Sequence, residues 1–257
     1  MRAGPDMTIS VLTVCRNAEA TIGRTIESFL AQDHPNKEMV LVDGASTDAT
    51  VAIARGFAAP QIRILSEPDR GMYDALNKGL GLYTGDAVGV LNADDAYRGG
   101  SVLSRIAEAL QDHDATHGDL DFHDGQGRVV RRWRGTPRPH RGFAAGWMPA
   151  HPTFYVRRQL AEAVGPFDTA LATAADYEWM LRAIEVHRAR LNHIPLVMVD
   201  MAMGGRSTAS LSAHVRHNLE ALAARRRWLR AGLVDWALVA KPASKLRQFA
   251  GVGRRPR

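Results

Sequence analysis

Residues 87–95 read AVGVLNADD, and this stretch decides the fold. The apolar run at 87–91 has the length and composition of a short strand. A strand without apolar–polar alternation is buried on both faces, which is typical of parallel sheets in α/β proteins. Asp94 and Asp95 follow the run at the end of the strand where such sheets bind their ligands. The stretch therefore predicts a fold class and the place of a site.

Three further units of the same kind precede this strand. Apolar runs at 8–14, 38–42 and 62–65 predict strands, and apolar residues with helical spacing follow each of them. Strands that alternate with helices in this way predict a parallel sheet covered on both faces. Polar residues stand at the ends of all these strands: Asn17, Asp43, Asp69 and the turn 92–95. Because the ends of parallel strands meet at one edge of the sheet, we expect one ligand site there.

The sequence changes character after Gly99, where the regular alternation of strands and helices ends. The expected elements are helices at 102–110 and 177–186, a hairpin at 118–133, a loop at 137–149 and strands at 151–157 and 193–199. We therefore divide the chain into residues 1–98, residues 99–210 as the second half of the same domain, and a basic helical tail at 211–257.

Bulk composition limits the class of protein. With 257 residues, of which 46% are hydrophobic and 23% charged, the chain has the composition of a globular protein with a sizeable core. Cys15 is the single cysteine, which excludes a disulfide framework and a cysteine zinc cluster. The sequence contains neither an apolar signal core nor an apolar run of about 18 residues. We expect a cytoplasmic protein without a membrane span.

The net charge of +6 is concentrated in the tail, where residues 211–257 contain eleven Lys and Arg and two acids. This distribution argues against a nucleic-acid-binding body. Apolar residues recur there at helical spacing beside basic ones: Leu219, Leu222, Leu229, Leu233 and Trp236, with Arg225, Arg226, Arg227 and Arg230. Such a helix either lies as a peripheral element on the anionic inner face of a membrane, or packs against the catalytic domain or a homodimer partner.

Two of the strand ends carry carboxylates with defined chemistry. Asp94 and Asp95 suit a hard divalent cation that bridges phosphate oxygens, although Asp is also common in ordinary turns. The residues alone leave these two interpretations open. Asp43 can accept the imide N–H of a pyrimidine base, while Ser46 or Thr47 would cap the helix that follows.

Five motifs then follow one another along the chain: TVCRN at 13–17, VDGASTD at 42–48, SEPDRGMYDALNKG at 66–79, LNADD at 91–95 and ADYEWMLR at 175–182. In this order and at these intervals they resemble the family 2 inverting glycosyltransferases of the GT-A fold. The resemblance covers residues 8–210. It implies an α/β fold with a Rossmann-like, mainly parallel central sheet flanked by helices, a smaller acceptor-side region and a C-terminal helical tail.

The resemblance also implies a site for a nucleotide-sugar donor, a uridine diphosphate sugar by family default, within residues 1–98. The residues implied to line the nucleoside and diphosphate are Thr13, Asn17, Asp43, Asp69, Asp74, Asn77, Lys78, Asn92 and Asp94. Asp94 and Asp95 would bind a divalent metal, Mn²⁺ or Mg²⁺, with Asp95 as the favoured ligand. Family members commonly have Asp at the position of Asn92.

Asp176 stands where the family places its general base, which deprotonates the acceptor hydroxyl during direct displacement. From the residues alone, Asp176 also fits the N-cap of the helix at 177–186. Family members often have an acid at the position of Ala175. The resemblance further places His151 and Arg206 on the acceptor or diphosphate side, Arg206 within the loop Gly-Gly-Arg-Ser at 204–207. From the residues alone, His151 also fits a structural role and the loop a linker to the tail. Glu178 is a second candidate for the base on the acceptor side, with a solvated or salt-bridged carboxylate as the alternative.

Three classes of function were weighed. The favoured one is an inverting, metal-dependent hexosyltransferase that acts on a glycan or lipid-linked acceptor in surface polysaccharide or glycolipid assembly. A dehydrogenase or P-loop kinase fits poorly, because the first strand lacks a following Gly-x-Gly-x-x-Gly and Gly-Lys-Ser/Thr is absent. A non-catalytic nucleotide-sugar-binding protein of the same fold is the alternative that Asn92 and Ala175 keep open.

Overall fold

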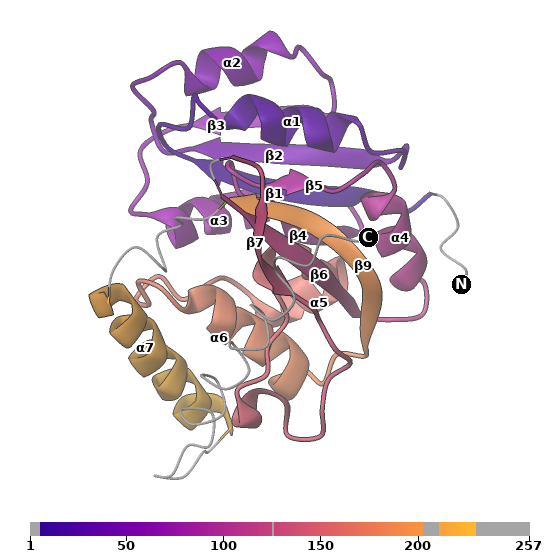
Figure 1. Cartoon of the computed structure of the whole chain (residues 1–257), viewed down its shortest axis with the longest axis vertical. Coiled ribbons are helices and arrows are strands. Elements are labelled where there is room, and N and C mark those ends of the chain that lie inside the picture. The colour runs from indigo at the N-terminus through magenta and orange to yellow at the C-terminus, as the bar shows by residue number, and fades with distance from the viewer. Residues whose placement is uncertain (1–5, 125, 203–210, 230–257) are drawn as a thin grey trace.

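A computed structural model describes residues 6–124, 126–202 and 211–229. Its centre is a curled sheet with helices on both faces (Figure 1). The first half contains β1 (Ile9–Cys15), α1 (Ile22–Leu30), β2 (Lys37–Asp43), α2 (Thr50–Gly56), β3 (Ile62–Ser66), α3 (Met72–Leu80) and β4 (Ala87–Val90). The alternation of strands and helices predicted from the sequence is confirmed for these units.

The second half is less regular. It contains β5 (Ala96–Tyr97), α4 (Val102–Ala109), β6 (Ala115–His123), β7 (Val129–Trp133), β8 (Tyr155–Arg157), α5 (Arg158–Val164), α6 (Ala175–Leu181) and β9 (Leu191–Ala202), followed by α7 (Leu211–Leu229). Short 3-10 turns occur at Gly142–Ala145 and His151–Thr153, and α6 continues as one π-helical turn at Arg182–Val186. The predicted hairpin is confirmed, because β6 and β7 pair antiparallel.

The strand order is β3-β2-β1-β4-β8-β6-β9-β5, with β7 beside β6. The first four strands run parallel, with β1 between β2 and β4. Beyond β4 the sheet is mixed, since β8 pairs antiparallel with β4 and β6, while β6 and β9 run parallel. The carboxyl ends of β1 to β4 therefore share one edge, as the sequence predicted.

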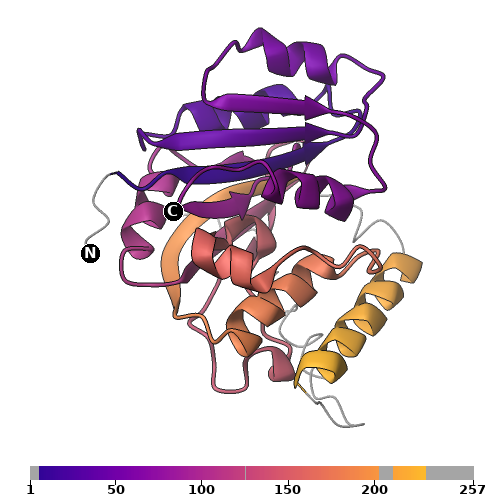
Figure 2. The ribbon, with the colours of Figure 1, turned by 180° about the vertical axis from the view of Figure 1, so that it is seen from behind.

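Strand β1 is buried along its whole length and contributes side chains to two hydrophobic cores. Ile9 and Val11 join the core that includes apolar residues of α1 and α4. Leu12 and Val14 point to the opposite face and join the core that includes residues of α3, α5 and α6. Figure 2 shows α3 and α5 on the side of the sheet that faces away from the viewer in Figure 1.

Helix α7 packs against α6, so the described part of the tail follows the packing interpretation. Its buried residues are Ala221, Ala224 and Arg225, whereas Leu219 is 61% exposed. Of the predicted leucine stripe, Leu229 packs against the core and Leu222 is half-buried, whereas Leu219 faces outward and Arg225 points inward. Leu233, Trp236 and Arg230 lie outside the described residues.

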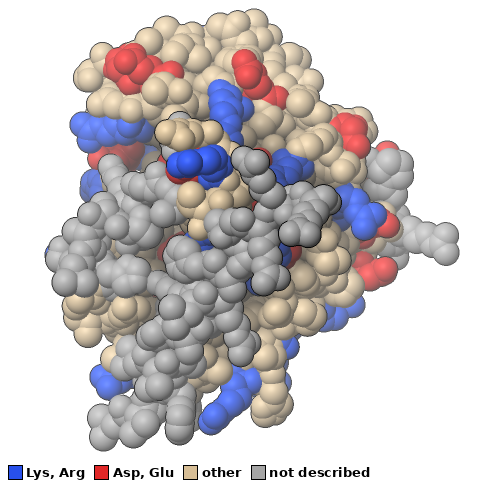
Figure 3. Space-filling model, in the orientation of Figure 1, with Lys and Arg blue, Asp and Glu red and all other residues tan. Residues whose placement is uncertain are grey.

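No helix among the described residues combines the length and apolarity that crossing a membrane requires. On the face drawn in Figure 3, described basic and acidic side chains are interspersed. This part of the surface therefore carries no continuous basic strip.

Gly89 offers a test of the sheet. It lies in β4 opposite Tyr155 of β8, and the Tyr155 ring covers the position that a Cβ atom would take. We expect Gly89→Ala to lower the free energy of unfolding by about 1–3 kcal/mol, because either the buried ring or the strand must move. Urea unfolding measures this loss.

Gly23→Ala is the matched control, since its Cβ would meet Ile53 at an ordinary 3.8 Å and α1 tolerates alanine well. Equal stability of the two variants would contradict the described packing of β4 against β8.

Candidate active site

The loops after β1 and β2 are tied together at the carboxyl edge of the sheet. Asn17 has a positive φ of 52°, a conformation that asparagine adopts more readily than most residues. Its backbone N–H donates to Ser46 Oγ at 2.8 Å, and its Oδ1 accepts from the Thr47 N–H at 2.9 Å. Asn17 thereby holds the loop after β1 against the loop after β2.

Asp43, at the end of β2, is a fully buried carboxylate surrounded by donors. It accepts hydrogen bonds from the Ser46 N–H at 3.0 Å, the Ser46 hydroxyl and Ser66 Oγ at 2.7 Å. Burial favours the neutral acid, but the bonds from Ser46 and Ser66 outweigh it and hold the pKa of Asp43 below its usual value. Asp43 is therefore an ionised acceptor held in one orientation.

The predicted cap at Ser46 or Thr47 is wrong. Helix α2 begins after Ala49 as its N-cap residue, and that position makes no side-chain cap. The Ser46 hydroxyl is used at Asp43 instead, and Asp48 accepts from the Thr50 N–H at 3.0 Å. A capping serine and a serine that supports a buried carboxylate have the same local sequence signal, so only the fold distinguishes them.

The turn before α3 brings Asp69 against the end of β2. Asp69 Oδ1 accepts from the Gly71 N–H at 2.8 Å, and Gly71 has a φ of 121°. A Cβ atom on Gly44 would collide with Asp69 Oδ2. The glycine at position 44 therefore permits the close approach that places Asp69 beside Asp43 at the edge.

The polar residues of α3 are engaged within the fold. Asp74 pairs with Arg70 at 2.9 Å, which lowers the pKa of Asp74. Lys78 Nζ donates to the Pro68 carbonyl at 2.7 Å and pairs with Glu67 at 2.7 Å.

Asn77 is engaged in the same way. Its side-chain amide exchanges two hydrogen bonds with the backbone of Phe167, at 2.8 and 3.0 Å. Of these residues, Asp74 and Lys78 hold the turn that carries Asp69, and Asn77 holds the segment around Phe167.

Thr13, the remaining predicted residue of β1, is fully buried. Its hydroxyl has no hydrogen-bond partner in the described part of the chain.

The acidic turn after β4 closes on itself. The Asp95 N–H donates to the Asn92 carbonyl at 3.1 Å, and Asn92 Nδ2 donates to Asp95 Oδ2 at 2.8 Å. Thr25 Oγ1 of α1 donates to the Asp95 carbonyl at 2.7 Å and fixes the turn against the helix. Asn92, which stands where the family commonly has Asp, therefore supports the Asp95 carboxylate as a neutral donor.

Asp95 is fully buried, and its Oδ1 lacks a hydrogen-bond partner among the described residues. Burial, and then the charge of Asp94, raise the pKa of Asp95 to about 8, although Asn92 and the Ala202 backbone partly oppose this. A buried carboxylate with one unpartnered oxygen and a raised pKa suits a cation. Asp94, beside it, is partly exposed.

These residues fit a divalent metal of the kind held by one or two carboxylates together with substrate phosphates. The described residues contain no group of three or more His, Cys, Asp or Glu side chains arranged as a metal site by themselves. Bound phosphate groups and water are the further ligands that such a site commonly uses. Asp94 is the more exposed of the two carboxylates, and Asp95 is the one with an unpartnered oxygen.

Asp176 lies in the first turn of α6, behind the N-cap residue Ala174. It is not the N-cap that the residues alone allowed. Tyr73 Oη of α3 donates to Asp176 Oδ1 at 3.2 Å, and His151 Nδ1 lies 3.9 Å from Oδ2. Burial lowers the pKa of His151 despite the neighbouring carboxylate, so the ring is neutral at neutral pH. The Asp176 side chain is 22% exposed.

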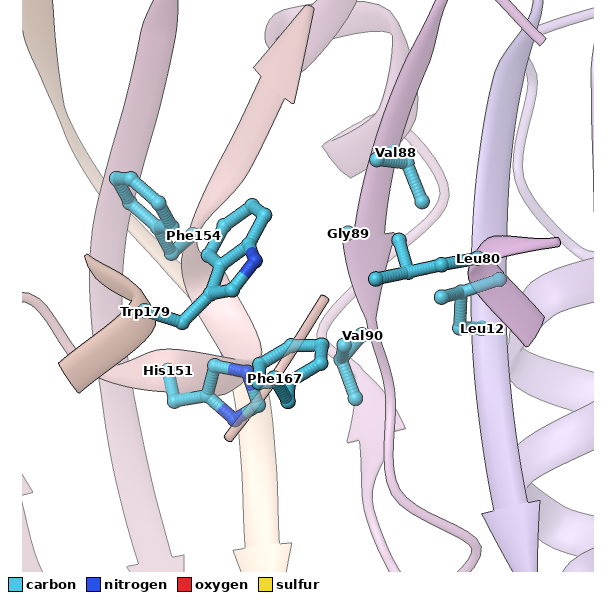
Figure 4. A pocket seen from close by; sticks show the side chains of 9 residues that line it. All are labelled: Leu12, Leu80, Val88, Gly89, Val90, His151, Phe154, Phe167 and Trp179. Carbon is cyan, nitrogen blue, oxygen red and sulfur yellow. The ribbon is translucent and has the colours of Figure 1, made fainter. Parts of the chain in front are cut away.

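An aromatic layer supports Asp176 and its partners. Phe167 stacks on Tyr73 at 6.1 Å and on Trp179 at 5.2 Å between ring centroids, and His151 meets Phe167 edge-on. Figure 4 shows His151 and Phe167 next to each other beside Val90. The cavity they line has a volume of about 20 Å³, room for about one water molecule. This cavity is too small for a sugar, so we do not assign it to the acceptor or the donor.

Glu178 is placed differently from the acceptor-side position that the sequence suggested. Its carboxylate is buried, receives Arg182 Nε at 2.9 Å and accepts from Trp228 Nε1 at 2.6 Å. It therefore forms the salt bridge that was considered for it as an alternative. Arg206 lies outside the described residues.

Sequence reasoning missed residues that hold the site from a distance. Tyr73 stands inside a recognised motif, four residues before Asn77, and that spacing was its only local signal. Arg98, directly after the acidic turn, pairs with Asp121 at 2.9 Å and Asp200 at 2.6 Å and so joins β5 to β6 and β9. These partners are too distant in sequence for any local pattern to connect them.

Comparison with known proteins identifies the family. The family model described as glycosyl transferase family 2 matches residues 10–173. The chain is a family 2 glycosyltransferase. A PGL/p-HBAD biosynthesis glycosyltransferase from Mycobacterium tuberculosis is 32% identical over 184 residues, 70% of each chain. An uncharacterized glycosyltransferase of the same species is 33% identical over 181 residues, 68% of each chain.

Solved structures of other glycosyltransferases have the same fold as this glycosyltransferase. The mannosyltransferase PcManGT from Pyrobaculum calidifontis, in complex with GDP-Man and Mn²⁺, has a TM-score of 0.68 at 22% identity, covering 98% of this chain and 78% of its own. TarS from S. aureus with UDP-GlcNAc has a TM-score of 0.65 at 19% identity, covering 90% and 69%. The GT-A fold expected from the resemblance is confirmed.

Asp95 makes the stability of this glycosyltransferase depend on pH. Its folded-state pKa of about 8 lies above the ordinary 3.8, so stability falls as pH rises between these values, and the full penalty is present above about 8. We expect Asp95→Asn to raise the melting temperature at about pH 8, by about 2–4 °C for each kcal/mol recovered. The gain should shrink toward about pH 4.

Thermal unfolding with and without Mn²⁺ measures both effects. A cation that binds ionised Asp95 should stabilise the wild type more than Asp95→Asn. A gain that does not change with pH would contradict the buried, unpartnered carboxylate.

Proposed function

We propose that this glycosyltransferase moves a sugar from a nucleotide diphosphate sugar to a hydroxyl acceptor with inversion at the anomeric carbon, and that Asp176 is the general base. The observation that carries the proposal is the exposure and the fixed orientation of the Asp176 carboxylate. It is partly exposed and is oriented by Tyr73, whereas Asp43 and Glu178 are enclosed by their partners. A base needs both properties, access to the acceptor and a fixed orientation.

In the proposed reaction, one Asp176 oxygen takes the proton of the acceptor hydroxyl while the acceptor oxygen attacks the anomeric carbon. The bond from that carbon to the nucleotide diphosphate breaks on the opposite face, and the diphosphate leaves with the bonding electrons. The Tyr73 hydroxyl holds the other side of the carboxylate. His151 lies next to Asp176 and is neutral, so it contributes a polar surface there and does not form an ion pair with the Asp176 carboxylate.

The donor lies along the edge formed by β1 to β4 in this proposal. Thr13, Asn17, Asp43 and Asp69 line the nucleoside, with Asp43 as acceptor for a base N–H, uracil by family default. The ionised state and fixed orientation of Asp43 support this role. UDP-GlcNAc and GDP-Man in the structural neighbours show that GT-A enzymes of this shape take nucleotide sugars. Asp74, Asn77 and Lys78 act on the donor through the turn and segment they hold.

Asp94 and Asp95 are the proposed ligands of a divalent metal, Mn²⁺ or Mg²⁺, with Asn92 as support. When bound, the metal would supply positive charge that balances the diphosphate of the donor. The unpartnered Asp95 Oδ1 and its raised pKa support this assignment, and the Mn²⁺ in the PcManGT complex is consistent with it. Arg206 is proposed to add charge on the diphosphate side.

The proposed acceptor is a glycan or lipid-linked precursor. The M. tuberculosis relative acts in PGL/p-HBAD biosynthesis by name, and ExoO of Rhizobium meliloti, 39% identical over 95 residues, is a succinoglycan biosynthesis protein. In this proposal residues 1–98 bind the donor, residues 99–210 form the acceptor side, and residues 211–257 contact the inner face of the membrane peripherally. Packing against a second copy of the chain stays a prediction.

Asp176→Asn tests the proposed base. The amide keeps the shape of the side chain but cannot take a proton, so we expect kcat for transfer to fall by about 100- to 10,000-fold. Donor binding should be unchanged. The measurement is release of nucleoside diphosphate across a panel of donors and acceptors, with donor-induced thermal shift as the binding control.

Two outcomes would overturn the proposal. Asp176→Asn with undiminished transfer would remove the base, and nucleotide-sugar binding without turnover on any acceptor would favour the non-catalytic alternative. Arg105→Ala, which removes an exposed ion pair with Glu108 on α4, is the matched control and should be without effect.

Sedimentation with anionic lipid vesicles tests the peripheral contact. Val215 and Leu219 are exposed on α7, at 52% and 61%, beside the exposed Arg216. We expect Val215→Asp and Leu219→Asp each to weaken vesicle binding by about tenfold, because an apolar side chain no longer enters the membrane interface. Val186→Asp, a change at an exposed apolar position outside α7, is the control. Equal binding by all variants would contradict a contact through α7.

A further inference from the structure

Glu220 of α7 reaches across to the segment that leads into α6. Its carboxylate accepts hydrogen bonds from the backbone N–H groups of Ala172 at 3.1 Å, Thr173 at 2.9 Å and Ala174 at 3.0 Å. The Thr173 hydroxyl adds a fourth bond at 3.0 Å. Successive N–H groups that converge in this way form a concave anion site, and here a side chain of the same protein fills it.

This contact lies directly before the N-terminus of α6, which has no side-chain cap. Its N-cap residue is Ala174, which has no side-chain oxygen to satisfy the first N–H groups of the helix. Glu220 satisfies the N–H groups immediately before them, and its negative charge lies at the positive end of the helix dipole. Asp176 stands only two residues after Ala174, so the Glu220 contact fixes the backbone from which Asp176 projects.

Further contacts hold α7 to the same short stretch. His217 and the Thr173 carbonyl lie at hydrogen-bond distance, 3.0 Å. Arg225, which is 1% exposed, donates to the Tyr177 hydroxyl at 2.8 Å, and Trp228 donates to Glu178 at 2.6 Å. Figures 1 and 2 both show α7 alongside α6. The anchored residues lie on both sides of Asp176 in the sequence.

We infer that Glu220 is a positioning residue for Asp176, and that α7 is therefore part of the transfer machinery. This inference rests on the proposed function, in which Asp176 is the base. Proton transfer requires the carboxylate oxygen within hydrogen-bond reach of the acceptor hydroxyl, and a displacement of about 1 Å can cost 100-fold in rate. Tyr73 restrains the carboxylate itself, and Glu220 restrains the backbone behind it.

The donor edge is separate from these contacts. None of the bonds to Glu220 involves β1, β2 or the acidic turn. A loss of Glu220 should therefore reduce the rate of transfer and leave donor binding intact, whereas a general loss of folding would reduce both.

The experiment compares Glu220→Ala and Glu220→Gln with the wild-type full chain. For Glu220→Ala we expect kcat for transfer to fall by about 10- to 100-fold, with KM for the donor and donor-induced thermal shift unchanged. Glu220→Gln keeps the length of the side chain and one acceptor oxygen, so its kcat should lie between those of the wild type and Glu220→Ala. Glu162→Ala, which removes a 62% exposed carboxylate on α5, is the matched control and should behave as the wild type.

Asp176→Asn, measured in parallel, separates the two claims. If Asp176→Asn loses transfer while Glu220→Ala keeps the wild-type kcat, the positioning role is overturned and the proposed base stands. If Asp176→Asn retains transfer, the proposed base itself is wrong. A parallel fall of kcat and donor binding in Glu220→Ala would assign Glu220 to general stability and overturn the inference. Should Glu220→Ala fail to fold, the kcat of Glu220→Gln decides by the same criteria.

Discussion

Strand β1 lies between two parallel neighbours, β2 and β4, and both of its faces are covered by helices. Its backbone groups are satisfied by the two ladders, and its side chains are apolar on both faces apart from small hydroxyl residues. Charged groups cannot be buried along such a strand at acceptable cost unless they are paired. They are confined to the loops at the strand ends, and the parallel direction brings these loops to one edge. The polar edge at which we propose that the donor binds follows from this constraint.

Two carboxylates at that edge show how the same residue type takes opposite roles. Asp43 and Asp95 are both fully buried. Asp43 is surrounded by hydroxyl and N–H donors, which keep it ionised and lower its pKa. Burial and the negative charge of Asp94 raise the pKa of Asp95 to about 8, and the support from Asn92 and the Ala202 backbone does not offset them. The first is a finished hydrogen-bond acceptor, and the second is suited to a cation.

The region around Asp176, the proposed acceptor side, depends instead on the long-range restraint of one short helix. Tyr73 comes from α3 and Glu220 from α7, and Asp176 lies between them. The aromatic stack of Tyr73, Phe167 and Trp179 connects this region to the floor of the sheet. Because hydrogen bonds and a buried arginine join α7 to α6 in addition to apolar contacts, the orientation of α7 is specific. The tail thereby becomes a structural partner of the proposed base.

The sequence by itself determined the β–α units, the parallel direction of β1 to β4 and the edge at which Asn17, Asp43, Asp69 and the acidic turn meet. These depend on apolar periodicity and strand length, which are local properties. Only the tertiary structure decided what each side chain contacts. Ser46 supports Asp43 instead of capping α2, Glu178 is paired with Arg182, and the buried face of α7 contains Arg225 while Leu219 is exposed. Such contacts join residues far apart in the chain, and hydrogen-bond geometry, burial and charge select them after the fold has brought the elements together.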